Sequence, residues 1–221
     1  TYVWAKHDGY DTINDAATTR GDVDALALMN VSASDVELTR ASGSSDLKVK
    51  VVSTGEILTV SNEFYGTGLD PWYNGGTYDY RIEQIRFADG LSWNFADILD
   101  KTKTIGTSGV DGLSGSNFQD NLYGLAGADT INGYDGNEVL VGGTGADSLN
   151  GGNGSDRYTW AKTEGNDTIT DDGTSLTEVD SLYLTDVSST GAVLTKSGTS
   201  LVITISATGE AITSTNRFYS S

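Results

Sequence analysis

Residues 106–159 divide into six consecutive nonapeptides with no residue left over, and this repeat constrains the fold more than any other feature of the chain. The first position is always glycine, the sixth is always acidic, and the eighth is always large and apolar or aromatic. The sixth-position residues are Asp111, Asp120, Asp129, Glu138, Asp147 and Asp156. A disordered linker has no reason to keep its apolar residues in phase over six units. The repeat therefore predicts ordered structure.

Glycine recurs in the turn part of each unit, at position 1 and, except where Phe118 replaces it, at position 4. Glycine permits the positive φ angles of tight turns, and three residues with one inward apolar side chain form a very short strand. Turn and strand together predict a coil with two nonapeptides per winding, an all-β fold of the parallel β-roll type. The turn glycines that we expect beside the acidic residues, at the metal sites argued below, are Gly106, Gly109, Gly124, Gly127, Gly133, Gly136, Gly142, Gly145, Gly151 and Gly154.

Burial alone does not hold such a coil together, because one large apolar side chain per unit offsets too little of the entropy lost in ordering nine residues. Rows of acidic residues add repulsion, so a cation is the missing stabilising component. If successive units alternate between the two edges, one edge carries Asp111, Asp129 and Asp147, and the other carries Asp120, Glu138 and Asp156. Carboxylates with turn carbonyls between them are hard oxygen ligands, which suit Ca²⁺ better than zinc or copper.

The nonapeptide pattern resembles the RTX, or haemolysin-type calcium-binding, repeat. This resemblance implies that one Ca²⁺ lies between turns n and n+2, which gives about four ions for the six units. A degenerate seventh turn containing Asp167 would add a fifth ion, paired with Asp147. Phe118 and Glu138 depart from the pattern, and we expect the edge that carries Glu138 to bind calcium more weakly.

A second, longer repeat of about 154 to 156 residues relates the beginning of the chain to its end. Tyr2, Trp4, Ala5 and Lys6 recur as Tyr158, Trp160, Ala161 and Lys162, residues 11–13 recur as 167–169, and Val23 and Asp24 recur as Val179 and Asp180. The chain therefore reads as one full unit and the start of another from a tandem array. Its expected parts are a β-rich flanking module over 1–105, the roll over 106–170, and a truncated second flanking module over 171–221.

Residues 1–100 predict mostly β structure. Strand-like runs occupy residues 25–31, 36–40, 47–52 and 57–60, and the alternating pattern around residues 53–56 indicates a hairpin. A short helix is expected over residues 94–99, with Asn94 as its N-cap. Residues 82–93 resemble a segment of the haemolysin-type calcium-binding related domain, which commonly accompanies the nonapeptides in secreted bacterial proteins.

Composition excludes several classes of function. The formal net charge of -18 argues against nucleic acid and against anionic membranes as partners. No apolar run is long enough for membrane insertion, and the absence of cysteine removes disulfides and thiolate sites. The single histidine, His7, is replaced by Thr163 in the second copy, and nothing distinguishes the Asp171-Asp172 pair from solvated turn residues. We therefore predict no catalytic residue and no enzymatic activity.

The aromatic stretch over residues 64–78 has two interpretations. Trp72 and Tyr73 could stack on a sugar ring and form a weak ligand-binding site for polysaccharide. The same side chains could instead cover the end of a sheet, because aromatic residues stabilise strongly when buried. Cover is the favoured interpretation, since short aromatic motifs produce many false positives.

The sequence thus predicts a non-enzymatic module that binds Ca²⁺ and folds outside the cell, in a secreted or cell-surface bacterial protein. The resemblance to RTX repeats implies that this protein is exported by a type I secretion system. Its partners would be calcium and neighbouring repeat modules of the same chain, in an array with a structural or adhesive role. The alternatives are an export and folding appendage of a secreted hydrolase or toxin, and a module that binds cell-surface polysaccharide.

Overall fold

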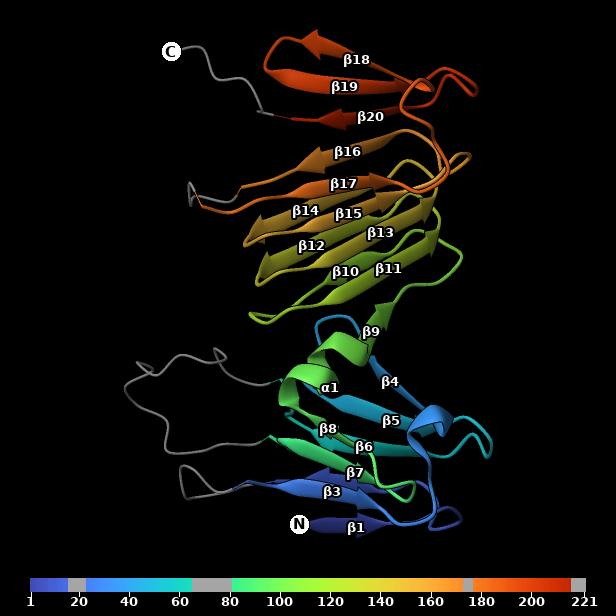
Figure 1. Cartoon of the computed structure of the whole chain (residues 1–221), viewed down its shortest axis with the longest axis vertical. Helices are drawn as coiled ribbons and strands as arrows, with labels where there is room; N and C mark the ends of the chain where they lie inside the picture. The colour runs from blue at the N-terminus through green and yellow to red at the C-terminus, as the bar shows by residue number, and fades with distance from the viewer. Residues whose placement is uncertain (16–22, 65–80, 173–176, 216–221) are drawn as a thin grey trace. The chain divides into compact units, whose positions relative to one another are not determined.

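The computed structural model describes residues 1–15, 23–64, 81–172 and 177–215. The chain forms two compact units, Thr1–Lys103 and Thr104–Ser221. Short strands make up nearly all of its regular structure, so the predicted all-β class is confirmed (Figure 1). Within the described ranges, no helix is long and apolar enough to cross a membrane.

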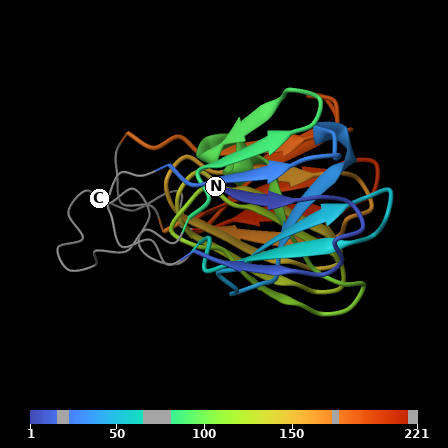
Figure 2. The same ribbon diagram turned by 90° about the horizontal axis from the view of Figure 1, so that it is seen from below.

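The first unit contains strands in two sheets. One sheet has the strand order β1-β3-β7-β8, and the other places β4, β5, β6 and β2 side by side in that order. The first is built from β1 (Tyr2–Trp4), β3 (Ala25–Leu28), β7 (Gln84–Phe87) and β8 (Ser92–Asn94). The second is built from β4 (Val36–Arg40), β5 (Leu47–Val51), β6 (Ile57–Ser61) and β2 (Thr12–Asn14), with a 3₁₀ turn, η1 (Ala33–Asp35), before β4. Figure 2 shows most of these blue-to-green strands running along a common direction.

Local sequence signals in this unit produce the structures that they predict. β5 and β6 form an antiparallel hairpin in which Val49 pairs with Leu58. Helix α1 (Phe95–Lys101) begins after Asn94, whose side chain accepts a hydrogen bond from the Asp97 N–H, while the Asp97 side chain accepts one from the Asn94 N–H. This reciprocal capping box satisfies two backbone donors at the start of the helix. The apolar faces of strands and helix share one buried core.

The second unit contains the roll. Strand β9 (Thr102–Ile105) spans the boundary between the units, and the roll strands then alternate between two parallel sheets (Figure 1). One sheet contains β10 (Gly112–Ser114), β12 (Thr130–Asp135), β14 (Ser148–Asn153) and β16 (Asp167–Thr170). The other contains β11 (Asn121–Ala126), β13 (Val139–Thr144), β15 (Arg157–Trp160) and β17 (Ser181–Leu184). Neighbouring nonapeptide strands of one sheet are 18 residues apart, so each winding contains two nonapeptides, as predicted.

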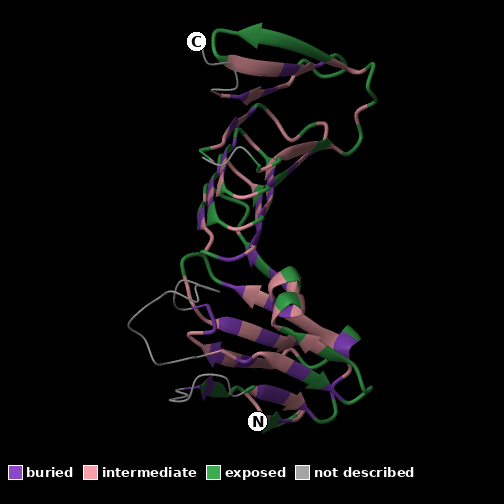
Figure 3. Ribbon diagram, turned by 60° about the vertical axis from the view of Figure 1, so that its left-hand side comes forward, coloured by how far each residue is buried: buried purple, intermediate pink, exposed green. Residues whose placement is uncertain are grey.

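The core of the roll is a column of eighth-position side chains. Leu113 pairs with Ile131 and Ile131 with Leu149 in one sheet, while Leu122 pairs with Leu140 and Leu140 with Tyr158 in the other. All six side chains are buried in one cluster. Because side chains alternate between the two faces of a strand, their neighbours in sequence point outward, and burial alternates along the roll strands (Figure 3).

Beyond the roll, three strands form an antiparallel meander, which joins the first roll sheet because β20 pairs in parallel with β16. The strands are β18 (Ala192–Ser197), β19 (Ser200–Ile205) and β20 (Ala211–Ser214). β18 is exposed along most of its length (Figure 3). Leu194 in this strand is 65% exposed, whereas its sequence counterpart Leu38 is 2% exposed and lies in the same buried cluster as Ile98 of α1.

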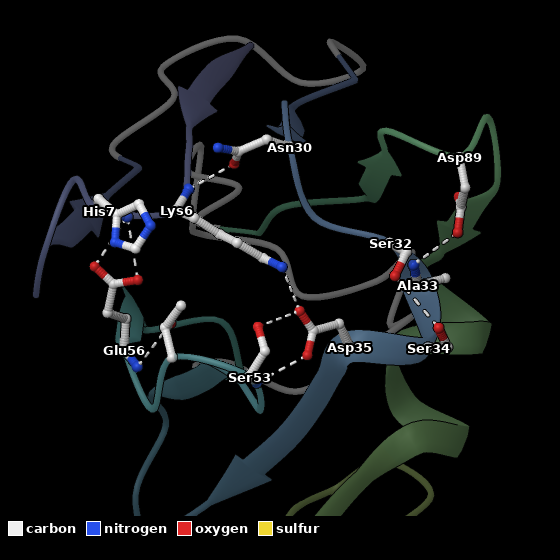
Figure 4. Close-up of polar contacts among 11 residues, drawn as sticks. Lys6, His7, Asn30, Ser32, Ala33, Ser34, Asp35, Ser53, Glu56 and Asp89 are labelled. Atoms are coloured by element: carbon white, nitrogen blue, oxygen red, sulfur yellow. Dashed lines mark hydrogen bonds and ion pairs between the residues drawn. The ribbon is translucent and has the colours of Figure 1, made fainter.

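The long sequence repeat is also a structural repeat. The backbone N–H of Lys6 donates to the Asn30 side chain, and that of His7 donates to Glu56 (Figure 4). The same contacts recur as Lys162 to Asp186 and Thr163 to Glu210. Strand pairing repeats as well, because β1 pairs with β3 as β15 pairs with β17, and β2 pairs with β6 as β16 pairs with β20. β1 and β2 therefore correspond to the last strands of the roll.

Candidate metal centre

Acidic side chains form two rows along the edges of the roll, connected by hydrogen bonds from one winding to the next. In the first row, the N–H of Asp111 donates to Oδ1 of Asp129, and the N–H of Asp129 donates to Oδ1 of Asp147, both over 2.8 Å. The N–H of Asp147 donates to Oδ1 of Asp167 over 2.9 Å. The structure thus places Asp111, Asp129 and Asp147 in one row, and Asp167, the expected partner of Asp147, continues that row.

The second row begins at Asp120, whose backbone carbonyl accepts a hydrogen bond from the Val139 N–H over 2.8 Å. The N–H of Glu138 donates to Oδ1 of Asp156 over 2.9 Å, and the N–H of Asp156 donates to Oδ1 of Asp180 over 3.1 Å. Glu138 thus joins this row through its backbone N–H, whereas neither oxygen of its carboxylate accepts a hydrogen bond from a described residue. Each carboxylate that accepts such a bond uses one oxygen and keeps the other for a different partner.

In the interior windings, that other oxygen has no hydrogen-bond partner among the residues that the structure describes. Asp129, Glu138, Asp147 and Asp156 are only 1–2% exposed. The Oδ2 atoms of the three aspartates and both carboxylate oxygens of Glu138 are buried and accept no hydrogen bond. Burying an ionised carboxylate without a partner is strongly unfavourable. A cation coordinated by these oxygens removes that cost, so the residues present fit a metal of the calcium class.

The first winding differs from the interior ones. Oδ2 of Asp111 accepts hydrogen bonds from the N–H and the hydroxyl of Thr107, over 2.6 and 2.9 Å. Oδ2 of Asp120 accepts the equivalent pair from Ser116, over 2.6 and 2.8 Å. A hydroxyl side chain at position 2 therefore provides each of these carboxylates with partners from its own turn. The six predicted carboxylates are not equivalent in their need for a cation.

The electrostatics of the interior carboxylates reflect their burial. Desolvation raises the pKa of Asp147 and Asp156 above the ordinary aspartate value, and it raises the pKa of Asp167 to about 7. The pKa of Glu138 is raised most, first by burial and then by the neighbouring charge of Asp156. In each case the folded roll disfavours the ionised carboxylate. Without a cation, we therefore expect these carboxylates to bind protons at a higher pH than free carboxylates do.

We therefore expect acid to stabilise the calcium-free roll. A folded-state pKa above the unfolded one means that the folded chain binds protons more tightly, so this stability is complete below about pH 4. It is lost as pH rises through the folded values, which for Asp167 is about 7. Circular dichroism of chelated protein should show more β structure at about pH 5 than at about pH 8.

Calcium should reverse this trend, because the cation binds deprotonated carboxylates and its affinity increases with pH. A calcium titration at both pH values is the control. Calcium-free protein whose β signal is the same at both, or larger at the higher pH, would show that these carboxyls do not limit folding.

The predicted glycines lie in the turns beside the carboxylates, and two of them show why. At Gly151, a Cβ would overlap Oδ2 of Asp156, so a side chain there would fill the space next to that oxygen. At Gly154, φ is +132° and a Cβ would overlap the carbonyl oxygen of Gly136 in the winding below. Position 1 thus leaves room at the carboxylate, and position 4 allows the turns to stack closely.

Sequence reasoning missed two residues at the end of the second row, Asp171 and Asp180. Each has one carboxylate oxygen within 4.8 Å of the other's and of one from Asp156. Both lie outside the nonapeptides, so the short repeat did not find them. The long repeat contains the missing signal, because Asp15 and Asp24 occupy the corresponding places in the first copy. Trp72 and Tyr73, the predicted polysaccharide contacts, lie outside the described residues.

Comparison with protein families agrees with this geometry. Residues 105–137 and 132–159 match the RTX calcium-binding nonapeptide repeat (4 copies). Residues 46–97 match the haemolysin-type calcium binding protein related domain. The chain therefore contains a calcium-binding RTX repeat module next to the related domain, which confirms the resemblance seen in its sequence.

Two solved structures are similar to this chain in part. The AlgE6R3 subunit of the Azotobacter vinelandii mannuronan C5-epimerase is 25% identical, over 49% of this chain and 72% of its own, with a TM-score of 0.38. The extracellular lipase LipA from Serratia marcescens is 18% identical, over 94% of this chain and 32% of the lipase chain, with a TM-score of 0.43. No curated protein sequence matches the chain.

Proposed function

We propose that this chain is a calcium-triggered folding module of a secreted bacterial protein. The observation that carries the proposal is the set of interior carboxylates, which are buried and present oxygens that accept no hydrogen bond from the described part of the chain. In calcium-free protein their mutual repulsion and the cost of desolvation oppose coiling of the chain. Ca²⁺ bound between windings converts that repulsion into attraction, so binding and folding are coupled.

The hydrogen bonds within the rows support the pairing of Asp111 with Asp129, Asp129 with Asp147, and Glu138 with Asp156. About four ions would lie between the successive carboxylates of the six nonapeptides, with oxygens of the turn backbone beside them. Those carboxylate pairs are Asp111 with Asp129, Asp129 with Asp147, Asp120 with Glu138, and Glu138 with Asp156. A fifth ion would lie between Asp147 and Asp167. The backbone N–H of Asp147 already donates a hydrogen bond to the Asp167 side chain.

The calcium dependence suggests where the module folds. Extracellular calcium modules bind with dissociation constants of about 10⁻⁴–10⁻³ M. A cytosol poor in calcium would keep the acidic roll unfolded for type I export, and the higher calcium concentration outside the cell would fold it. The formal charge of -18 favours an expanded chain before calcium binds.

The structural repeat favours a tandem array over a single appendage of a hydrolase or toxin. In this proposal, flanking modules over 1–105 and 171–221 alternate with rolls such as 106–170, and neighbouring modules of one chain are partners. Contacts such as His7 to Glu56 and Thr163 to Glu210 support a common module plan. The role is structural or adhesive, and we assign the acidic residues to binding instead of catalysis.

A circular dichroism titration with Ca²⁺, begun from chelated protein and repeated with Mg²⁺, tests the proposal. The expected result is a cooperative gain of β signal in the range of about 0.1–1 mM Ca²⁺, with Mg²⁺ much less effective because it needs tighter octahedral geometry and holds its water. A roll that is fully folded in chelator would refute calcium-triggered folding.

A further inference from the structure

A cluster of three carboxylates lies where the roll ends and the second flanking module begins. Asp156 belongs to the last nonapeptide, Asp171 directly follows β16, and Asp180 directly precedes β17. One carboxylate oxygen from each lies within 4.8 Å of the others. The residue that follows β16 and the residue that precedes β17 thus both belong to this carboxylate cluster.

Asp156 is the buried centre of this cluster. It is 1% exposed, its Oδ1 accepts the hydrogen bond from Glu138, and its Oδ2 accepts none. Its own N–H donates to Oδ1 of Asp180, and its carbonyl accepts from the Ser181 N–H over 2.8 Å. Docking of β17 on the roll therefore brings a second carboxylate to one that is already buried and whose Oδ2 accepts no hydrogen bond from a described residue.

Tyr158 lies close to the same carboxylates, and their negative charge affects its hydroxyl. Burial raises the pKa of its hydroxyl, and the charges of Asp171 and Asp156 raise it further. The hydroxyl accepts a hydrogen bond from the Gly151 N–H over 2.8 Å, which holds it at the edge of the roll beside Asp156. The Tyr158 hydroxyl is neutral, so the negative charge to be balanced by a cation belongs to the carboxylates of Asp156 and Asp171.

Asp171 makes this cluster different from the carboxylate pairs inside the roll. It follows Thr170, so it stands where the nonapeptide pattern has its first-position glycine. Inside the roll, a side chain at that position would collide with the carboxylate of its own turn, as at Gly151. At the end of the roll, the position instead contributes a third carboxylate, so this cluster carries more charge than a pair of sixth-position residues.

Two of the three carboxylates and the tyrosine have counterparts in the first copy, which argues against a chance arrangement. Asp15, Asp24 and Tyr2 correspond to Asp171, Asp180 and Tyr158, each at a separation of about 156 residues. Asp15 is only 4% exposed. The pKa of Tyr2 is raised by burial, then by the charge of Asp15, with a further contribution from Asp24. Both copies thus gather two aspartates around a tyrosine at the corresponding place.

We propose that Asp156, Asp171 and Asp180 bind one further Ca²⁺ ion, which fastens β17 to the last winding of the roll. Oxygens on a common Ca²⁺ lie 2.3–2.6 Å from it and so up to about 5 Å apart, which accommodates the spacing of these three. The ion would couple roll formation to docking of the flanking module, whose Leu182 and Leu184 pack against the roll core. This goes beyond the nonapeptide sites, because two of the three ligands lie outside the repeat.

Counting bound ions by native mass spectrometry, with Ca²⁺ as the only added metal, tests the site. Asp171→Asn and Asp180→Asn should each bind one ion fewer than the wild type. Asp172→Asn is the matched control, because Asp172 is the exposed neighbour of Asp171 and bonds Asn150 instead of the cluster. It should keep the wild-type count. An unchanged count in Asp171→Asn would overturn the proposal.

Hydrogen exchange provides a readout that a general loss of stability would not imitate. At saturating Ca²⁺, Asp171→Asn should accelerate exchange in β17 by about tenfold or more while β12 and β13 keep their protection. Equal protection of β17 in variant and wild type would refute the coupling. The proposed calcium-triggered folding fails separately: if the wild type binds no Ca²⁺, both proposals fall, whereas normal wild-type binding with an unchanged Asp171→Asn count removes this site alone.

Discussion

Chelation of calcium will unfold the roll of the second unit while the first unit stays folded. The first unit has its own apolar core, formed by both of its sheets and by α1. The roll has one column of apolar side chains, flanked by buried carboxylates whose free oxygens lack protein partners. Because no described residue takes the place of the cation at the interior carboxylates, the local stability of the roll at neutral pH should fall to about zero, whereas the first unit loses little.

Hydrogen exchange with mass spectrometry measures the two units separately. In excess chelator, amides of β12 and β13 should exchange at close to the rate of an unfolded peptide, and amides of β5 and β6 should remain protected. Tryptophan fluorescence gives a second readout, because Trp160 is buried in the roll and Trp4 is buried in the first unit. Re-addition of Ca²⁺ is the control for reversibility. Loss of protection in both units together, or in neither, would contradict this division.

The second large effect is expected for Asp129→Asn. This substitution keeps an oxygen that can accept the Asp111 N–H. It removes the charge that, in the proposed pairing, Asp129 contributes to two calcium sites. The calcium midpoint of folding should increase by about tenfold or more, since the charge and number of ligands set affinity in calcium sites. Circular dichroism titrations of wild type and variant at the same ionic strength measure the shift.

Asp111→Asn is the matched control in the same row. Oδ2 of Asp111 already accepts two hydrogen bonds from Thr107, whereas Oδ2 of Asp129 is buried and accepts none. The control should therefore shift the midpoint by less than about threefold. Equal shifts in the two variants would mean that partner-free oxygens do not identify the strongest sites.

The same titration compares the two edges of the roll. Because Glu138 departs from the aspartate of the pattern, Asp129→Ala is expected to raise the calcium midpoint more than Glu138→Ala. Glu138 is as deeply buried as Asp129, and neither of its oxygens accepts a hydrogen bond from the residues that the structure describes. The weaker binding of its edge thus stays a prediction, and equal or reversed effects would refute it.

The contacts between equivalent positions of successive windings could be predicted from the sequence. The spacing of Leu113, Ile131 and Leu149 determined which side chains stack, since a nine-residue repeat with two units per winding makes residues 18 apart neighbours. The same spacing determined the carboxylate rows. Local signals also sufficed for the hairpin of β5 and β6 and for the capping box at Asn94, because both depend on residues close in sequence.

Only the tertiary structure decided how the rows begin and end. The hydroxyls of Thr107 and Ser116 give the first carboxylates partners that the interior ones lack, which depends on side-chain geometry within a turn. Asp171 and Asp180 reach Asp156 through a connection that does not follow the nine-residue period, so counting nonapeptides does not place them there. A period determines contacts between equivalent residues, whereas contacts outside the period depend on where the folded chain returns.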